Sequence, residues 1–220
     1  MTTVFLRRIA LFFSAIIFCF SILYTFVLLN VQTVYVEKSF YFLVCENVHI
    51  QASTYETQLL GGAGYLLRTE EQDFVAVSVY LSEENATLIQ KQVSQPTRII
   101  VLNNSKLYLK NLREKRLQAQ LQSAFSCLED CIELLNGEIV RIDKGATQET
   151  SKRILQKLCG NLFYLEKEYA ETLPTFSMVF QQTREQLENV VGQIIYAQDL
   201  RYTLCFLCDC YVKLGEEYSL

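Results

Sequence analysis

Hydrophobic and polar positions alternate along the first half of the chain in a pattern that occurs twice, 34 residues apart. An apolar, aromatic-rich run opens each copy, at residues 40–45 and 74–79. A segment rich in Ala, Leu, Gln and Glu follows, and a short apolar run closes each copy, at residues 65–67 and 99–101. Aromatic and β-branched runs favour strands, whereas the mixed segments favour helices. The pattern therefore predicts a ferredoxin-like βαββαβ domain, with a four-stranded antiparallel sheet and two helices on one face.

Turn and capping residues fit this doubled unit. The G-G-A-G cluster at residues 61–64 follows the first predicted helix, and glycine adopts positive φ without steric cost, so the cluster predicts a helix end and a turn into the next strand. Pro96 marks the corresponding turn in the second copy. Ser82, followed by Glu83 and Glu84, predicts the start of the second helix, because a capping hydroxyl and acidic side chains stabilise a helix N-terminus.

Three apolar seams with alternating spacings of three and four residues follow in the C-terminal half, over residues 121–135, 155–169 and 176–194. Such seams predict helices that pack lengthwise on one another. Short connections favour an antiparallel three-helix bundle within one chain. An oligomeric coiled coil is the alternative, particularly for a charged helix that begins near Asn104.

Local signals predict where these three helices begin and end. Asn136 and Gly137 predict the end of the first helix, and Thr147 the start of the second. Pro174 fits the first turn of the third helix, where its missing N–H is not needed.

The most hydrophobic stretch of the chain runs without a charged residue from Ile9 to Leu29. About 20 apolar residues are enough to cross the hydrocarbon core of a bilayer as a helix. Arg7 and Arg8 precede the stretch, so the positive-inside rule places the N-terminus in the cytoplasm and residues 31–220 outside. A cleaved signal peptide would have a shorter apolar core and a small-residue cleavage site. We therefore expect a single-pass signal anchor that holds the protein in the lipid bilayer of the cell membrane.

These elements predict an α+β protein in four parts. Residues 1–30 form a cytoplasmic tip and the transmembrane anchor, and residues 31–37 a linker. Residues 38–103 form the βαββαβ domain, and residues 104–220 the helical bundle.

The charge balance narrows the range of partners. The chain carries a net charge of −4, and its predicted external part is acidic throughout, without a stripe of Lys and Arg. Binding to nucleic-acid phosphates requires clustered basic side chains. We therefore expect no nucleic-acid partner.

Eight cysteines raise the question of disulfides and metals. Cys19 lies in the predicted span, which leaves an odd number outside. An oxidising exterior predicts three disulfides and one free thiol, whereas reducing surroundings leave the thiols as small apolar core residues. Cys205, Cys208 and Cys210 have a spacing that would suit zinc, but no further ligand set completes a site, so we expect core packing and no metal or cofactor.

The run "YFLVCENVHIQASTYETQLLGGAGYLL", followed by "FVAVSVYLSEENATLIQKQV", resembles a SPOR domain. The resemblance covers residues 38–103 and includes the order of strands and helices and the position after a membrane anchor. SPOR domains are small extracytoplasmic modules of single-pass bacterial membrane proteins, and they bind peptidoglycan glycan strands stripped of their stem peptides. The resemblance thus implies glycan binding and a part in cell division, wall remodelling or sporulation.

A glycan site of this kind would lie on the open face of the sheet. We expect it to comprise Tyr41, Tyr65, Ser78 and Tyr80, because aromatic faces stack on sugar rings and hydroxyls bond to sugar hydroxyls. The first strand is apolar on both of its faces, however, which predicts that the C-terminal chain covers the second face.

Departures from the family pattern leave a second function open. Val44 stands where the first strand of the family has Gln, and Ser78, Val79 and Tyr80 replace its Gly-Pro-Phe. The alternative is a structural or assembly factor that does not bind glycan and docks another membrane protein through its sheet or its helical bundle. The sequence contains no G-x-S-x-G, H-E-x-x-H or phosphate-loop motif, and His49 is its only histidine, so we expect no catalytic residues and no enzyme.

Overall fold

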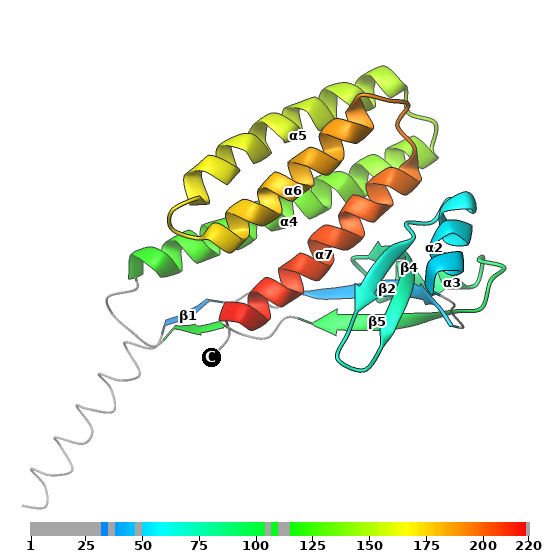
Figure 1. Cartoon of the computed structure of the whole chain (residues 1–220), viewed down its shortest axis with the longest axis horizontal. Coiled ribbons are helices and arrows are strands. Elements are labelled where there is room, and N and C mark those ends of the chain that lie inside the picture. The colour runs from blue at the N-terminus through cyan, green and yellow to red at the C-terminus, as the bar shows by residue number, and fades with distance from the viewer. Residues whose placement is uncertain (1–31, 35–37, 47–49, 104–106, 110–114, 219–220) are drawn as a thin grey trace, which may run out of the picture.

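The structure is a computed structural model that describes residues 32–34, 38–46, 50–103, 107–109 and 115–218. Six strands and six helices lie within these residues. Within those residues the fold is α+β: an antiparallel sheet with two short helices on one face lies against a bundle of long helices (Figure 1). No described helix combines the length and the apolar composition that a membrane span requires. The anchor predicted from Ile9 to Leu29 lies outside the described residues.

The sheet has the predicted βαββαβ arrangement. Its strands are β2 (Ser39–Cys45), β3 (Tyr65–Arg68), β4 (Asp73–Tyr80) and β5 (Thr97–Asn103). They pair antiparallel in the order β3-β4-β2-β5, so each half of the repeat brackets a strand of the other half. The connecting helices are α2 (Ile50–Leu59) and α3 (Glu83–Gln90). The predicted βαββαβ succession and its four-stranded antiparallel sheet are therefore confirmed.

The predicted turn and cap residues occupy the expected places. Gly61 has φ of 83° and Gly64 has φ of 61°, and they lead from the end of α2 into β3. A side chain at Gly64 would also meet the backbone, since its Cβ would lie 2.7 Å from the carbonyl oxygen of Thr54. Ser82 caps α3, because its hydroxyl accepts a 3.3 Å hydrogen bond from the backbone N–H of Asn85. The local signals of the repeat were correct.

The C-terminal half contains four helices rather than the predicted three. They are α4 (Lys115–Asp143), α5 (Gln148–Tyr169), α6 (Pro174–Val191) and α7 (Ala197–Tyr218). Thr147 and Pro174 stand at the starts of α5 and α6, as predicted. The apolar seams of these two helices are buried against each other within one chain, as a single-chain bundle requires. The prediction of a helical bundle is confirmed, and its helix count was wrong.

The C-terminal end of α4 also differs from the prediction. Helix α4 continues through Asn136 and Gly137, because Glu138 and Ile139 in the next turn are buried and hold the chain in the bundle. The helix ends only before Gly145, which has φ of 86°.

A small second sheet lies beside the main one. Strand β1 (Gln32–Val34) pairs antiparallel with β6 (Leu107–Leu109), so part of the predicted linker is a strand, and the helix expected from about Asn104 begins later.

Helix α7 joins the sheet to the bundle. It crosses the sheet face opposite α2 and α3, and it also packs on α4 and α6 (Figure 1). Four aromatic rings pack edge to face across this contact. The ring centroid of Phe40 in β2 lies 5.3 Å from that of Tyr211 in α7. The Tyr211 centroid lies 5.1 Å from that of Phe125 in α4, which in turn lies 5.0 Å from that of Phe176 in α6. All four side chains are buried, and fully burying one such side chain stabilises a fold by about 1.5–3 kcal/mol. Sheet and bundle therefore share one hydrophobic core.

Candidate functional site

The four residues predicted to form a glycan site lie on two different faces of the sheet. Tyr41 pairs with Tyr80 across β2 and β4, and Ser78 pairs with Leu43, so these residues share the face that carries α2 and α3. Tyr65 and Val44 both pair with Ala76, which places Tyr65 on the face that carries α7. The structure brings Tyr41, Ser78 and Tyr80 onto one face and separates Tyr65 from them.

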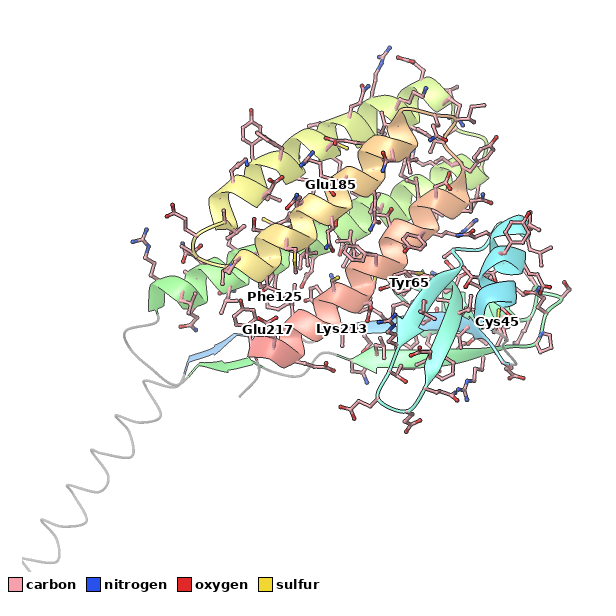
Figure 2. All side chains as sticks on the ribbon, in the orientation of Figure 1. Cys45, Tyr65, Phe125, Glu185, Lys213 and Glu217 are labelled. Carbon is pink, nitrogen blue, oxygen red and sulfur yellow. The ribbon has the colours of Figure 1, made fainter. Side chains whose placement is uncertain are left out.

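Tyr65 is a buried contact between β3 and α7. Its hydroxyl donates a 2.7 Å hydrogen bond to Asp209 Oδ2, which also accepts a 2.7 Å bond from Lys213 Nζ. Figure 2 shows Tyr65 and Lys213 where α7 crosses the sheet. Burial, followed by the nearby Asp209 carboxylate, holds the pKa of Tyr65 far above its usual value. The phenol therefore stays neutral, and Tyr65 is positioned as a structural tie rather than as an exposed binding residue.

Neither face of the sheet is open along its centre. On the α7 side, Phe40 and Phe42 have no exposed surface, and on the α2 side Cys45 Sγ lies 3.6 Å from Thr57 Oγ1. The predicted coverage of the second face by the C-terminal chain is confirmed, and the helix that provides it is α7. A ligand site at this sheet must therefore lie at an edge.

Such an edge site exists beside β4. Strand β3 pairs only with the first half of β4, and the loop before β3 leaves a hollow of about 550 Å³ beside residues 77–80. The hollow, which we term the β4 groove, lies between the loop after α2 and α3 on one side and α4 and α7 on the other. Its residues include Ser78 and Tyr80, two of the three predicted site residues that share this face, and do not include Tyr41.

An ion pair forms the polar end of the β4 groove. Arg201 Nη2 of α7 lies 2.6 Å from Asp143 Oδ2 at the end of α4, and Arg201 Nη1 donates a 2.8 Å hydrogen bond to the carbonyl oxygen of Gly61. One guanidinium thus links α7, α4 and the α2–β3 loop. Burial raises the pKa of Tyr80, while a hydrogen bond with Ser78 and the charge of Arg201 partly oppose that rise. These groups are held by one another and form no nucleophile–base pair.

The rim of the β4 groove is apolar and faces solvent. Leu60 is 68% exposed, Leu88 56% and Val140 43%, and they come from the loop directly after α2, from α3 and from α4. Single exposed apolar residues are ordinary on protein surfaces, but three around one hollow mark a surface suited to an apolar partner. The sequence pattern did not predict this rim, because its residues lie on three elements far apart in the chain.

The cysteines lie mostly in the core. Cys205 and Cys208 of α7 have no exposed surface, and the seven cysteines in the described part of the chain are free thiols. Burial raises the pKa of Cys131 and of Cys210 to about 12, so these thiols are neutral at physiological pH. Over the same residues, no group of three or more His, Cys, Asp or Glu side chains is arranged to hold a metal ion. The thiols act as small apolar side chains, as the sequence analysis expected for Cys208.

Comparison with known proteins adds no relative: no family model, no curated protein and no solved structure matches the chain. The resemblance to SPOR domains therefore stays a prediction from the sequence.

Proposed function

We propose that the protein is a non-enzymatic, membrane-anchored envelope protein that acts as an assembly factor and docks a second membrane protein in the β4 groove. One observation carries this proposal: α7 occupies the sheet face on which a SPOR-type glycan site would lie, while an apolar rim stays exposed at the edge of β4. The anchor from Ile9 to Leu29 would keep residues 31–220 beside the extracytoplasmic surface of the membrane.

The chemistry of the β4 groove indicates the partner segment. Leu60, Leu88 and Val140 offer apolar contact, and burial of such surface contributes about 25 cal/mol per Å². The Arg201–Asp143 pair closes one end with matched charges, so the groove has no net charge there to attract an ionic ligand. A short apolar segment of a partner protein fits these features.

Site-specific photo-crosslinking in membranes of the native host tests this function. A photo-reactive amino acid at Leu88 should form one discrete crosslink, and the additional change Val140→Glu should weaken it about tenfold or more, since a charge in the docked groove remains unsolvated. The same photo-reactive residue at Tyr164, on the exposed side of α5, is the matched control and should form no such crosslink. Equal crosslinking from both positions, or none from Leu88, would reject docking in this groove.

Glycan-strand binding is the second candidate function. It is favoured by the hydroxyls of Ser78 and Tyr80, which line the β4 groove together with the amides of Asn85 and Asn136. Co-sedimentation of the detergent-solubilised chain with peptidoglycan sacculi, before and after an amidase removes the stem peptides, measures it. Pelleting that rises on amidase-treated sacculi supports glycan binding, and a folded sample that stays in the supernatant with both preparations excludes it.

A further inference from the structure

The main sheet has two edges, and the structure protects them differently. At one edge, β3 is four residues long and ends in the exposed Arg68, beside a turn with exposed Glu70 and Glu71. Short strands and charged side chains are the usual means by which natural proteins prevent a sheet edge from pairing with another chain. The edge formed by β3 is therefore protected.

The opposite edge, formed by β5, is long and regular. β5 has seven residues and, in the described part of the chain, pairs with β2 alone, at one margin of the sheet (Figure 1). The pairing with β2 continues over all seven residues without a bulge. The carbonyl oxygen of Thr97 accepts a 2.7 Å hydrogen bond from Gln90 Nε2, so the open part of the edge runs from Arg98 to Asn103. It offers a further strand a row of backbone donors and acceptors.

The side chains of β5 do not protect this edge. The strand, T-R-I-I-V-L-N, contains four consecutive apolar residues, and Val101 is 45% exposed. Arg98 is the one charged residue of the strand, and its guanidinium carbon lies 4.5 Å from the ring centroid of Phe74. Phe74 belongs to β4, beyond β2, so the charge extends across the sheet and away from the edge. An apolar, β-branched edge without a protecting charge favours strand pairing.

We propose that β5 pairs antiparallel with β5 of a second copy of this chain, so that two four-stranded sheets form one continuous sheet. The sequence of β5 is complementary to itself in a register centred on Ile100. That register places Ile99 opposite Val101 of the second copy, a pair of β-branched residues. It places Arg98 opposite Leu102, so the two arginines of the pair do not face each other, as like charges would destabilise it.

The symmetry of this pairing explains why a second copy suits the edge. Residues opposite each other in antiparallel strands share a face, so the two-fold axis is perpendicular to the sheet. The same surface is used on both copies, and the contact closes on itself, because each β5 covers the open edge of the other. The axis also keeps α7 on the same face of both sheets. This inference goes beyond docking in the β4 groove and does not depend on it.

Disulfide crosslinking of the full chain, purified in detergent, tests the pairing and its register. Ile100→Cys places two thiols directly opposite each other, at a Cα separation of about 4.5–5.5 Å that a disulfide spans. We expect a covalent dimer on a non-reducing gel, above the level that the native thiols of the parent chain give. Leu102→Cys is the matched control on the same face of β5. Its two thiols would lie four residues apart along the strands, about 13 Å, and should form no such dimer.

Two results of this experiment would overturn the proposal. If a folded Ile100→Cys chain gave no covalent dimer, the edge would belong to a strand of another protein. If Ile100→Cys and Leu102→Cys gave dimers in equal yield, the strands would be parallel and in register, because equal positions then lie opposite each other along the whole strand.

Sedimentation equilibrium of the same chain measures the association itself. Val101→Lys should weaken dimerisation by about tenfold or more, because it places two positive charges diagonally across the strand pair. The side chain of Val101 is already 45% exposed, so the fold should persist, which circular dichroism checks. Tyr164→Lys, on the exposed side of α5, is the matched control and should dimerise as the parent does. A monomeric parent chain, or a dimer that Val101→Lys leaves unchanged, would refute pairing through β5.

Discussion

The bond from Tyr65 to Asp209 is a residue-scale contact between sheet and bundle. Asp209 is only 3% exposed, and hydrogen bonds to charged groups contribute about 1.5–3 kcal/mol. We expect Tyr65→Phe to lower the free energy of unfolding by that amount, because it deletes the hydroxyl and keeps the ring against Tyr202. Urea denaturation measures the change. Tyr164→Phe, on the surface of α5, should stay within about 0.5 kcal/mol, and equal effects of the two variants would contradict the expectation.

A comparison of two glycines with similar backbone angles distinguishes the cost of positive φ from the cost of a steric clash. Gly64 (φ 61°) and Gly145 (φ 86°) both have positive φ, which costs a residue with a Cβ about 1–2 kcal/mol. A Cβ at Gly145 would meet nothing within 4 Å, whereas a Cβ at Gly64 would lie 2.7 Å from the backbone oxygen of Thr54. We expect Gly64→Ala to destabilise the protein clearly more than Gly145→Ala in urea denaturation. Equal losses would show that the α2–β3 loop moves to admit the methyl group.

Single residues of the candidate site were predictable only in part. Ser78 and Tyr80 carry hydroxyls on a predicted strand, and the structure places both in the β4 groove. Tyr65 also carries a hydroxyl on a predicted strand, but it is buried and bonded to Asp209. Arg201 and Asp143 were not predicted, since Arg201 meets Asp143 and the Gly61 carbonyl only through the packing of α7 and α4 on the sheet domain. Contacts between residues so far apart in sequence leave no local pattern.

At the scale of elements, the sequence pattern predicted the strands and helices of the sheet domain but did not predict α7. The repeat combines aromatic and β-branched runs with turn signals, and both are local features that one strand or helix carries alone. Helix α7 is buried on two sides, by the sheet and by the other helices, and residues such as Leu204, Cys205, Leu207 and Cys208 line several of its faces. A helix buried on more than one side has no single apolar stripe, so the seam that predicted α5 and α6 is missing.

The burial of α7 has a consequence at high pH. Burial, with a smaller effect of Asp209, raises the pKa of Cys210 from its ordinary value of 9.0 to about 12, so folding favours the neutral thiol. Its contribution to stability is complete below pH 9 and is lost as the pH rises toward 12. We expect the parent to lose stability relative to Cys210→Ala between pH 9 and 11 in urea denaturation. The difference in free energy of unfolding between the two proteins should be constant from pH 7 to 8. If it stayed constant up to pH 11, the pKa of Cys210 would not be raised by folding.

At the scale of the whole molecule, the shared core makes the sheet and the bundle one folding unit. A continuous row of ring contacts leads from β2 through α7 and α4 to α6, by way of Phe40, Tyr211, Phe125 and Phe176. Polar ties run parallel to them, since Glu129 of α4 accepts a 2.6 Å bond from the Tyr211 hydroxyl and a 3.0 Å bond from Lys38 Nζ, just before β2. The predicted division at residue 103 therefore separates elements of the chain and not independent cores.

Truncation of Tyr211 tests this unity, because its ring lies between Phe40 and Phe125. Replacing a buried aromatic residue with Ala costs about 3–5 kcal/mol. We expect Tyr211→Ala to speed hydrogen exchange of β2 and of α4 together, as followed by mass spectrometry on peptides from each. The control is Leu155→Ala, a cavity in α5 away from the sheet, which should affect both elements only through global unfolding. If Tyr211→Ala loosened β2 and left α4 protected, the sheet would unfold as a separate domain, and α7 would be a cover rather than the common core of the molecule.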